Sequence, residues 1–228
     1  MYQYINKIKI TFEYVEGVLL NPDNGIRIFS YNNQIYDYKE FSGKVQELLR
    51  NVIYEEDDFL NKQDIVIFEG EYIKGKRNGK GKEYNENGSL IYEGEFKDGK
   101  RNGHGKEYYN NNVLIFEGEY LNGEKNGNGK EYNTKGILIF EGEFQDGQKR
   151  KGKEYNENNI IFDGEFQNGK EWNGKKNIYN EKYKLWFDGK IKNGKKNGNW
   201  KEYVNGKVVF EENYLFGNKI ETERNGKK

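Results

Sequence analysis

The chain has 228 residues, and its 38 basic and 38 acidic side chains cancel to a formal net charge of zero. This balance argues against wholesale binding to nucleic acid or to an anionic membrane, because both partners need a positive field. The sequence has no cysteine, which excludes disulfides and thiolate zinc sites. No apolar run reaches the ~18 residues of a membrane span, and no apolar signal segment is present, so we expect a cytoplasmic protein.

The first 66 residues lack a clear repeat and are expected to form an N-terminal cap. Apolar and polar residues alternate in residues 8–12 and 26–28, on either side of an Asn-Pro-Asp-Asn-Gly cluster, which predicts a β-hairpin. Further on, apolar residues at helical spacing predict a short helix over about residues 38–52. These residues are Phe41, Val45, Leu48, Leu49 and Val52.

The same region has a second interpretation, a decayed repeat, because residues 34–44 loosely echo residues 90–100. A repeat array needs an atypical terminal unit to cover its apolar end, and this segment is placed to supply one. The sequence leaves both interpretations open.

From Ile67 onward the chain repeats itself. The stretch IFEGEYIKGKRNGKGKEYNENGSL at residues 67–90 returns at 91–114 and 115–138, and then less regularly. We expect six to seven units over residues 67–219, followed by a polar tail at 220–228. In the last, partial unit Glu212 takes the place of the first glycine. The first glycines are Gly70, Gly94, Gly118, Gly142, Gly164 and Gly189.

Each unit predicts one β-hairpin. In residues 68–72 the two aromatics and the glycine share one face of a strand and the two glutamates share the other. The glycine leaves a gap that a neighbouring backbone or ring can fill. Residues 74–79 supply a glycine-containing turn and residues 81–84 a return strand. The expected fold is all-β, an elongated array of consecutive antiparallel hairpins, with a small hairpin and a short helix as the cap.

Two aromatic positions persist through the array, one in the first strand of each unit and one in the return strand. We expect both rows to form the core, because aromatic pairs contribute about 0.5–1.5 kcal/mol beyond their area burial. Glutamates and lysines of neighbouring strands, such as Glu69 and Lys82, are expected to pair on a solvated face. The first row is Phe68, Tyr92, Phe116, Phe140, Phe162, Phe187 and Phe210, and the second is Tyr84, Tyr108, Tyr132, Tyr155, Tyr179 and Tyr203.

The motif Tyr/Phe-Glu-Gly-Glu-Phe/Tyr-x-x-Gly-x-x-x-Gly-x-Gly resembles the membrane occupation and recognition nexus (MORN) repeat, over some two-thirds of the chain. Residues 198–206, GNWKEYVNG, are similar to MORN-variant repeats of bacterial antitoxin-like proteins. The chain departs from the family in a slightly longer period and in asparagine where a histidine often precedes the third glycine. The resemblance implies a twisted hairpin array used in protein–protein contact and, in some members, in lipid contact or dimerisation. It transfers no catalytic site.

We expect no enzyme activity, no cofactor and no metal site. The one histidine, His104, occupies a position that varies between units, and the carboxylates recur in every unit, so that no acid–base pair stands out. Trp186 and Trp200 are expected to fill gaps in the core. Candidate partner contacts lie where the array departs from its own pattern, in the shortened fourth unit and the turn of the fifth, because an exposed tryptophan is a common hot spot. They are Trp172, Lys149, Arg150 and Lys151.

The leading hypothesis is a non-enzymatic scaffold that binds a protein partner. One alternative is a peripheral membrane module that contacts acidic phospholipids weakly through its lysine rows, and another is an antitoxin-like immunity protein. A homodimer is compatible with the resemblance, and nucleic acid is not an expected partner.

Overall fold

The computed structural model describes residues 7–12, 15–18, 28–31, 34–37, 43–51, 63–180 and 184–220, with side chains from Val66 onward except at positions 111 and 184. The chain divides into unit 1, residues 1–124, and unit 2, residues 125–228. Within the described residues, the secondary structure is β-strand apart from one short 3-10 helix, η3 (Asn110–Asn112). The prediction of an all-β fold is therefore confirmed.

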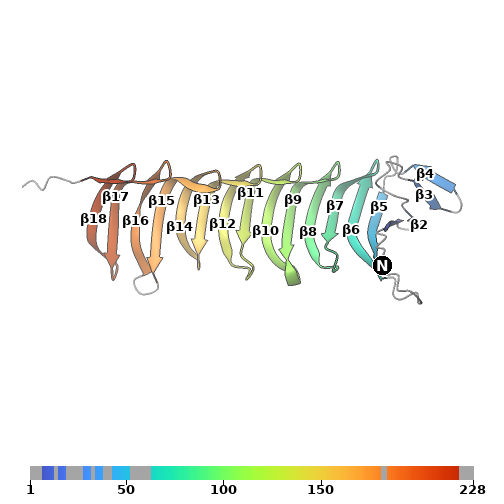
Figure 1. Ribbon diagram of the computed structural model, residues 1–228, viewed down its shortest axis with the longest axis horizontal. Helices are drawn as coiled ribbons and strands as arrows, with labels where there is room; N and C mark the ends of the chain where they lie inside the picture. The colour runs from blue at the N-terminus through green and yellow to red at the C-terminus, as the bar shows by residue number, and fades with distance from the viewer. Residues whose placement is uncertain are drawn as a thin grey trace, which may run out of the picture. The chain divides into compact units, whose positions relative to one another are not determined.

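The described residues of unit 1 form ten strands. In chain order they are β1 (Lys7–Phe12), β2 (Val15–Val18), β3 (Ile28–Tyr31), β4 (Gln34–Asp37), β5 (Gly43–Asn51), β6 (Gln63–Ile73), β7 (Lys76–Tyr84), β8 (Leu90–Lys97), β9 (Lys100–Tyr109) and β10 (Val113–Leu121). From β5 to β10 each strand pairs antiparallel with the next (Figure 1). Strand β1 pairs with β5 and β2 at the other edge, and β3 pairs with β4 in a separate sheet.

Unit 2 continues the pattern. Its strands are β11 (Glu124–Tyr132), β12 (Leu138–Gln145), β13 (Gln148–Asn156), β14 (Asn159–Gln167), β15 (Lys170–Asn180), β16 (Lys184–Lys192), β17 (Lys195–Val204), β18 (Lys207–Leu215) and β19 (Asn218–Ile220). Each pairs antiparallel with the next. The prediction of consecutive hairpins is thus confirmed in both units. The predicted tail starts inside β19, and residues 221–228 lie outside the described residues.

The tight turns follow from their sequence. In the turn between β8 and β9, Asp98 and Gly99 have φ values of 51° and 86°, the left-handed pair that two-residue hairpin turns require and that Asp-Gly supplies readily. The N–H of Gly99 also donates to the carbonyl of Arg77 in the preceding hairpin, at 2.9 Å. The same bond recurs from Gly194 to the carbonyl of Trp172. Each of these turns therefore closes its own hairpin and ties it to the one before.

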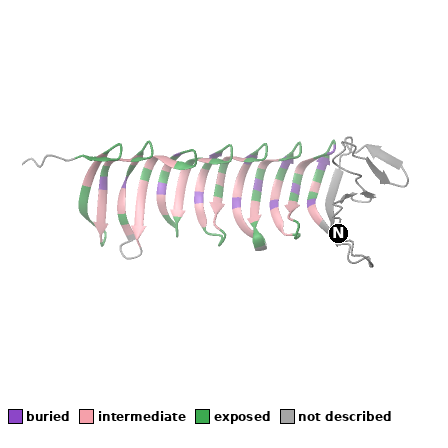
Figure 2. Cartoon of the chain, viewed as in Figure 1, coloured by how far each residue is buried: buried purple, intermediate pink, exposed green. Residues whose placement is uncertain are grey.

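The core is one side chain thick. Phe68 is 0% exposed, and its ring lies across Gly70 and Gly81, which are paired across β6 and β7. A Cβ on Gly81 would sit 2.6 Å from Cζ of Phe68. The ring also meets Phe96 of the next hairpin edge-on, with centroids 5.2 Å apart. Unit 2 repeats this contact between Phe140 and Phe166 at 5.5 Å, and the buried residues recur as purple bands in Figure 2.

The predicted helix is wrong, because residues 43–51 form β5. Val45 lies opposite Gly70 and Glu47 opposite Phe68, with a bulge between Glu47 and Leu48. The return strand β7 has the same register and bulge against β8. The reason is visible in the sequence: GKVQEL at 43–48 matches GKGKEY at 79–84, so pairing with β6 overrides the helical spacing of the apolar residues. Strand β5 thus takes the place of a return strand, in a register that differs from the predicted echo of residues 90–100 by residues 34–44, and the decayed-repeat interpretation stays a prediction.

The predicted N-terminal hairpin pairs the wrong strands. Strand β1 pairs with β2 rather than with the strand that contains Ile28. Two residues separate β1 from β2, so the nearer partner wins, and the glycine inside VEGV at 15–18 weakened its strand signal. The Asn-Pro-Asp-Asn-Gly cluster at residues 21–25 lies outside the described residues.

Candidate interaction faces of the sheet

Each sheet has two chemically different faces. We call the face with the buried rings the ring face; in the first hairpin it carries Phe68 with Arg77, whose guanidinium lies 4.3 Å from the ring centroid. We call the other the tyrosine face; there the hydroxyl of Tyr84 donates to Glu69 at 3.4 Å, and Glu69 lies opposite Lys82. Glu69 and Lys82 are thus cross-strand neighbours, and an ion pair between them stays a prediction.

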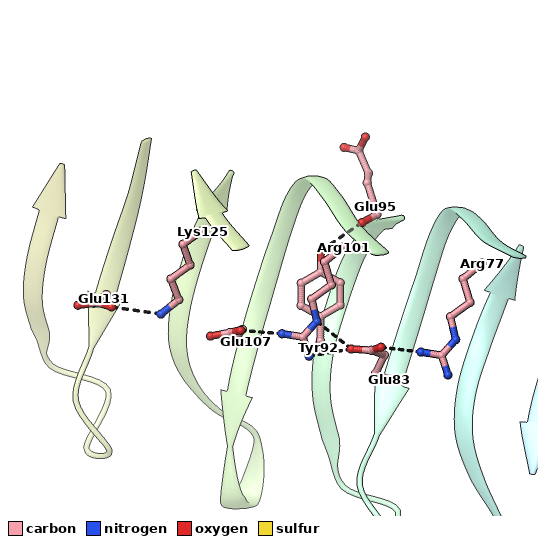
Figure 3. Close-up of polar contacts among 8 residues, drawn as sticks. All are labelled: Arg77, Glu83, Tyr92, Glu95, Arg101, Glu107, Lys125 and Glu131. Atoms are coloured by element: carbon pink, nitrogen blue, oxygen red, sulfur yellow. Dashed lines mark hydrogen bonds and ion pairs between the residues drawn. The ribbon is translucent and has the colours of Figure 1, made fainter. Parts of the chain in front are cut away.

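The ring face of unit 1 is covered by a row of alternating charges, which we call the charge ladder (Figure 3). Arg101 lies 4.2 Å over the Tyr92 ring and contacts Glu83 at 2.7 Å and Glu107 at 2.6 Å. Arg77 contacts the same Glu83 at 2.6 Å. The planar guanidinium can bind a carboxylate on each side while it stacks on a ring. The ladder therefore links neighbouring hairpins and shields the rings from water.

In unit 2 the ladder changes. Lys149 lies 4.7 Å over Phe140 and contacts Glu154 at 2.8 Å and Glu131 at 3.6 Å; Lys125 also contacts Glu131, at 3.1 Å (Figure 3). In the next hairpin the polarity is inverted. Glu171 takes the cation's place opposite Phe166, Lys176 takes the carboxylate's place opposite Phe162, and the two form an ion pair.

Strand β15 interrupts the regular pairing register of the repeat. On the edge of β15 that pairs with β14, Lys176 lies opposite the first-strand aromatic Phe162. On the edge that pairs with β16, Ile178 lies opposite the first-strand aromatic Phe187. The two edges of one strand thus differ in register by two residues, which accounts for the long spacing between Gly164 and Gly189. A register shift of this kind leaves the fold intact and changes the side chains that each face presents.

Two candidate contact residues are the extra residues of bulges. Trp172 lies between Glu171 and Asn173, which oppose successive residues of β14, and Arg150 lies in the same way between Lys149 and Lys151. Trp172 is half-buried within β15, so its predicted place in a turn is wrong. Arg150 and Lys151 are exposed, whereas Lys149 belongs to the charge ladder.

The hairpin of β16 and β17, the sixth when β6–β7 is counted as the first, fills its core differently. Trp200 replaces a glycine, is 4% exposed, and its ring lies where a Cβ on Gly189 would come within 2.2 Å. Its Nε1–H donates to the carbonyl of Lys190 at 3.1 Å. The prediction that Trp200 fills the core is confirmed. The same prediction for Trp186 is wrong, because that side chain is 38% exposed and donates to Glu202 at 3.1 Å.

The return-strand tyrosines are not the core, so this prediction is wrong. They follow a residue that faces the rings and therefore point to the opposite face. Tyr108 is half-buried and donates to Glu93 at 2.6 Å, and Tyr155 donates to Glu141 at 2.5 Å. Burial, and then the bond to Glu93, raises the pKa of Tyr108 to about 12. Burial, and then the bond to Glu141, likewise raises the pKa of Tyr155 to about 12.

The neutral chain has a charge asymmetry between its two units. Residues 125–228 hold 22 lysines and arginines and 16 aspartates and glutamates, a net charge of +6. Residues 1–124 hold 16 and 22, a net charge of −6. A separate count for each half of the sequence would have found this. The positive charge thus gathers in unit 2, although the whole chain is neutral.

Among the described residues no three His, Cys, Asp or Glu side chains are grouped so as to hold a metal ion, and His104 is exposed. No helix within the described part of the chain is long and apolar enough to cross a membrane.

The comparisons with known proteins agree with the hairpin pattern. The family model described as MORN repeat matches residues 68–90, 92–113 and 116–137. Each match begins at a buried first-strand aromatic, Phe68, Tyr92 or Phe116. No curated protein matches the chain, and the similarity to antitoxin-like proteins stays a prediction. Residues 68–137 are thus three MORN repeats in succession, in a single-layer sheet of hairpins whose rings lie on paired glycines.

Proposed function

We propose that the chain is a non-enzymatic scaffold that binds a protein partner on the faces of its hairpin sheets. The burial of the rings and the ion pairs that cover them support this proposal. The rings and glycines make the core and the ladder covers it, which leaves regular rows of half-exposed side chains across many hairpins. Such rows suit a long partner that makes many weak contacts.

Affinity capture by the full chain, followed by mass spectrometry, tests the proposal. The matched control is the double variant Arg150→Glu and Lys151→Glu, because both side chains are exposed and the fold should survive. We expect a specific protein to be recovered by the native chain and depleted with the variant. Recovery of no specific protein, together with a measured catalytic turnover, would contradict the proposal.

Peripheral binding of acidic phospholipids is the second candidate, and the net charge of +6 in unit 2 favours it. Each lysine or arginine near an anionic surface contributes about 1 kcal/mol. Flotation with phosphatidylserine vesicles at physiological salt provides the test. Co-flotation that the Arg150→Glu and Lys151→Glu variant loses would support this candidate, and no co-flotation removes it.

A further inference from the structure

Two of the tight turns have the same sequence and backbone but differ in one hydrogen bond. The pairs Asn168-Gly169 and Asn193-Gly194 are both followed by lysine, are both exposed, and have the same φ values of 51° and 71°. The N–H of Gly194 donates to the carbonyl of Trp172 in the preceding hairpin at 2.9 Å. Among the described residues, the N–H of Gly169 has no such backbone acceptor. The glycine nitrogen is therefore held in one turn and left open to solvent in the other.

The other Asn-Gly turns in the described part of the chain divide in the same way. Gly88, which follows Asn87, donates to the carbonyl of Asn85 at 2.9 Å, and Gly123 donates to that of Arg101 at 2.8 Å. Gly206, in the turn between β17 and β18, resembles Gly169 in having no backbone acceptor among the described residues. The closing bond of a β-turn uses the N–H of the residue after this glycine. The glycine N–H is thus bound only where a further carbonyl comes close to it.

An open glycine nitrogen after an asparagine is a nucleophile beside a side-chain amide. The backbone nitrogen attacks Cγ of the asparagine, a C–N bond closes a five-membered succinimide ring, and ammonia leaves with the proton of the N–H. Water then opens the ring at either carbonyl, which gives an aspartate or an isoaspartate. Glycine has no side chain that hinders this ring. A glycine N–H that is bound to a carbonyl must first break that bond, so we expect the bound turns to react more slowly.

We propose that Asn168 and Asn205 are sites of spontaneous deamidation, whereas the three turn asparagines that precede a bound glycine are protected. The co-reactant is water, and both sites are exposed to it. The geometry of the turns carries this inference, which does not depend on the proposed scaffold function.

The aspartate product fits the same turns. Asp98 and Asp146 already occupy the first turn position in other hairpins, with φ values of 51° and 49°. Deamidation to aspartate therefore preserves the hairpin, whereas isoaspartate adds a carbon to the backbone of the turn. Both sites lie in unit 2 and each gains one negative charge, so the net charge of this unit falls from +6 to +4. The modification thus weakens the charge asymmetry between the units.

Peptide mapping by mass spectrometry tests the proposal on the native full chain. The protein is kept in mildly alkaline buffer, with a second sample in denaturant, and the conversion of each asparagine is followed in both. The folded-to-unfolded ratio of rates removes the effect of neighbouring sequence. We expect this ratio to be roughly two- to tenfold higher at Asn168 than at Asn193, the factor by which one backbone hydrogen bond shifts an opening equilibrium. Equal ratios, or no conversion of Asn168 and Asn205 in the folded chain, would overturn the proposal.

Two further measurements test its premises. Amide hydrogen exchange by NMR should be faster at Gly169 than at Gly194, and equal protection would contradict the proposal. Gly169→Ala should slow conversion at Asn168 several-fold and leave Asn205 unchanged, because the added Cβ hinders the ring. That Cβ meets no atom within 4 Å, but the positive φ strains alanine, so a thermal melt checks the fold. If this variant does not fold, Gly206→Ala serves with the two sites exchanged. An unchanged rate at the asparagine before the alanine contradicts attack by the glycine nitrogen.

Discussion

Units 1 and 2 are built from the same hairpin, but they vary it to different degrees. In unit 1 the ladder is carried by arginines that each stack on a ring, and its polarity is regular. In unit 2 lysines replace them, and the polarity reverses at Glu171 and Lys176. The rings lie on paired glycines in both, as at Gly94 and Gly105 or at Gly164 and Gly174. The glycine pair and its ring are thus the structural requirement, and the charges above them can change sign.

The sixth hairpin shows that even the ring can come from the other strand. Where a glycine of the return strand becomes Trp200, that indole is the buried group and the first-strand aromatic Phe187 is only half-buried. Lys196 then lies over the indole, 4.4 Å from its centroid, as Arg77 lies over Phe68 in the first hairpin. The requirement is therefore for a ring above the glycine, whichever strand supplies it.

The largest expected effect tests this exchange of roles. Phe162→Ala should destabilise the protein by about 3–5 kcal/mol, because it empties a fully buried site in the thin core. Phe187→Ala should cost clearly less, since Trp200 holds the buried place there. Urea unfolding of both variants gives the comparison. Equal losses would mean that the first-strand aromatic keeps its role in the sixth hairpin.

The sequence was a good guide to the hairpins and a poor guide to the faces. The period and the alternation in residues 68–72 predicted each strand, because both are local properties of the chain. The side on which Tyr108 lies depends on its register with the next strand. The helical spacing of apolar residues within 43–51 predicted a helix wrongly, because the pairing of this segment with β6 is a non-local interaction. The bulges at Arg150 and Trp172 depend on two strands at once, so no single stretch of sequence predicts them.

The second prediction concerns the glycine pairs that both units share. A Cβ on Gly94 would come within 2.6 Å of the Gly105 Cα, and one on Gly164 within 2.2 Å of the Asn173 carbonyl oxygen. Because backbone must move, Gly94→Ala and Gly164→Ala should each cost about 1–3 kcal/mol. The exposed neighbour Glu165 supplies the control, and Glu165→Ala should stay within about 0.5 kcal/mol. If only one of the glycine variants is destabilised in urea, the units do not share this requirement.

The third prediction uses the tyrosine faces, where the units are expected to agree. The pKa of Tyr108 and of Tyr155 is raised to about 12 in the folded protein, above the value near 10 of an exposed tyrosine. The folded state therefore holds these protons more tightly. Their stabilisation is complete below pH 10 and is lost as the pH rises through about 12.

Tyr108→Phe and Tyr155→Phe should each make the fall in stability above pH 10 shallower, by at most about 1.4 kcal/mol per pH unit. Urea unfolding measured at intervals from pH 8 to the alkaline limit supplies the slopes. An unchanged slope in both variants would show that these hydroxyls titrate alike in the folded and unfolded chains.

The smallest expected effect concerns the cations of the charge ladder, which are arginines in unit 1 and lysines in part of unit 2. Arg101 binds Glu83 and Glu107 and stacks on Tyr92, whereas Lys149 offers only a point charge to its two carboxylates. Arg101→Lys should therefore cost about 0.5–1 kcal/mol, and Lys149→Arg should gain up to about 0.5 kcal/mol, since these half-exposed contacts are screened by water. Both differences should shrink in high salt, where exposed ion pairs weaken. A gain from Arg101→Lys, or a loss from Lys149→Arg, would mean that each hairpin is fitted to its own cation and that the ladder is more than a cover for the rings.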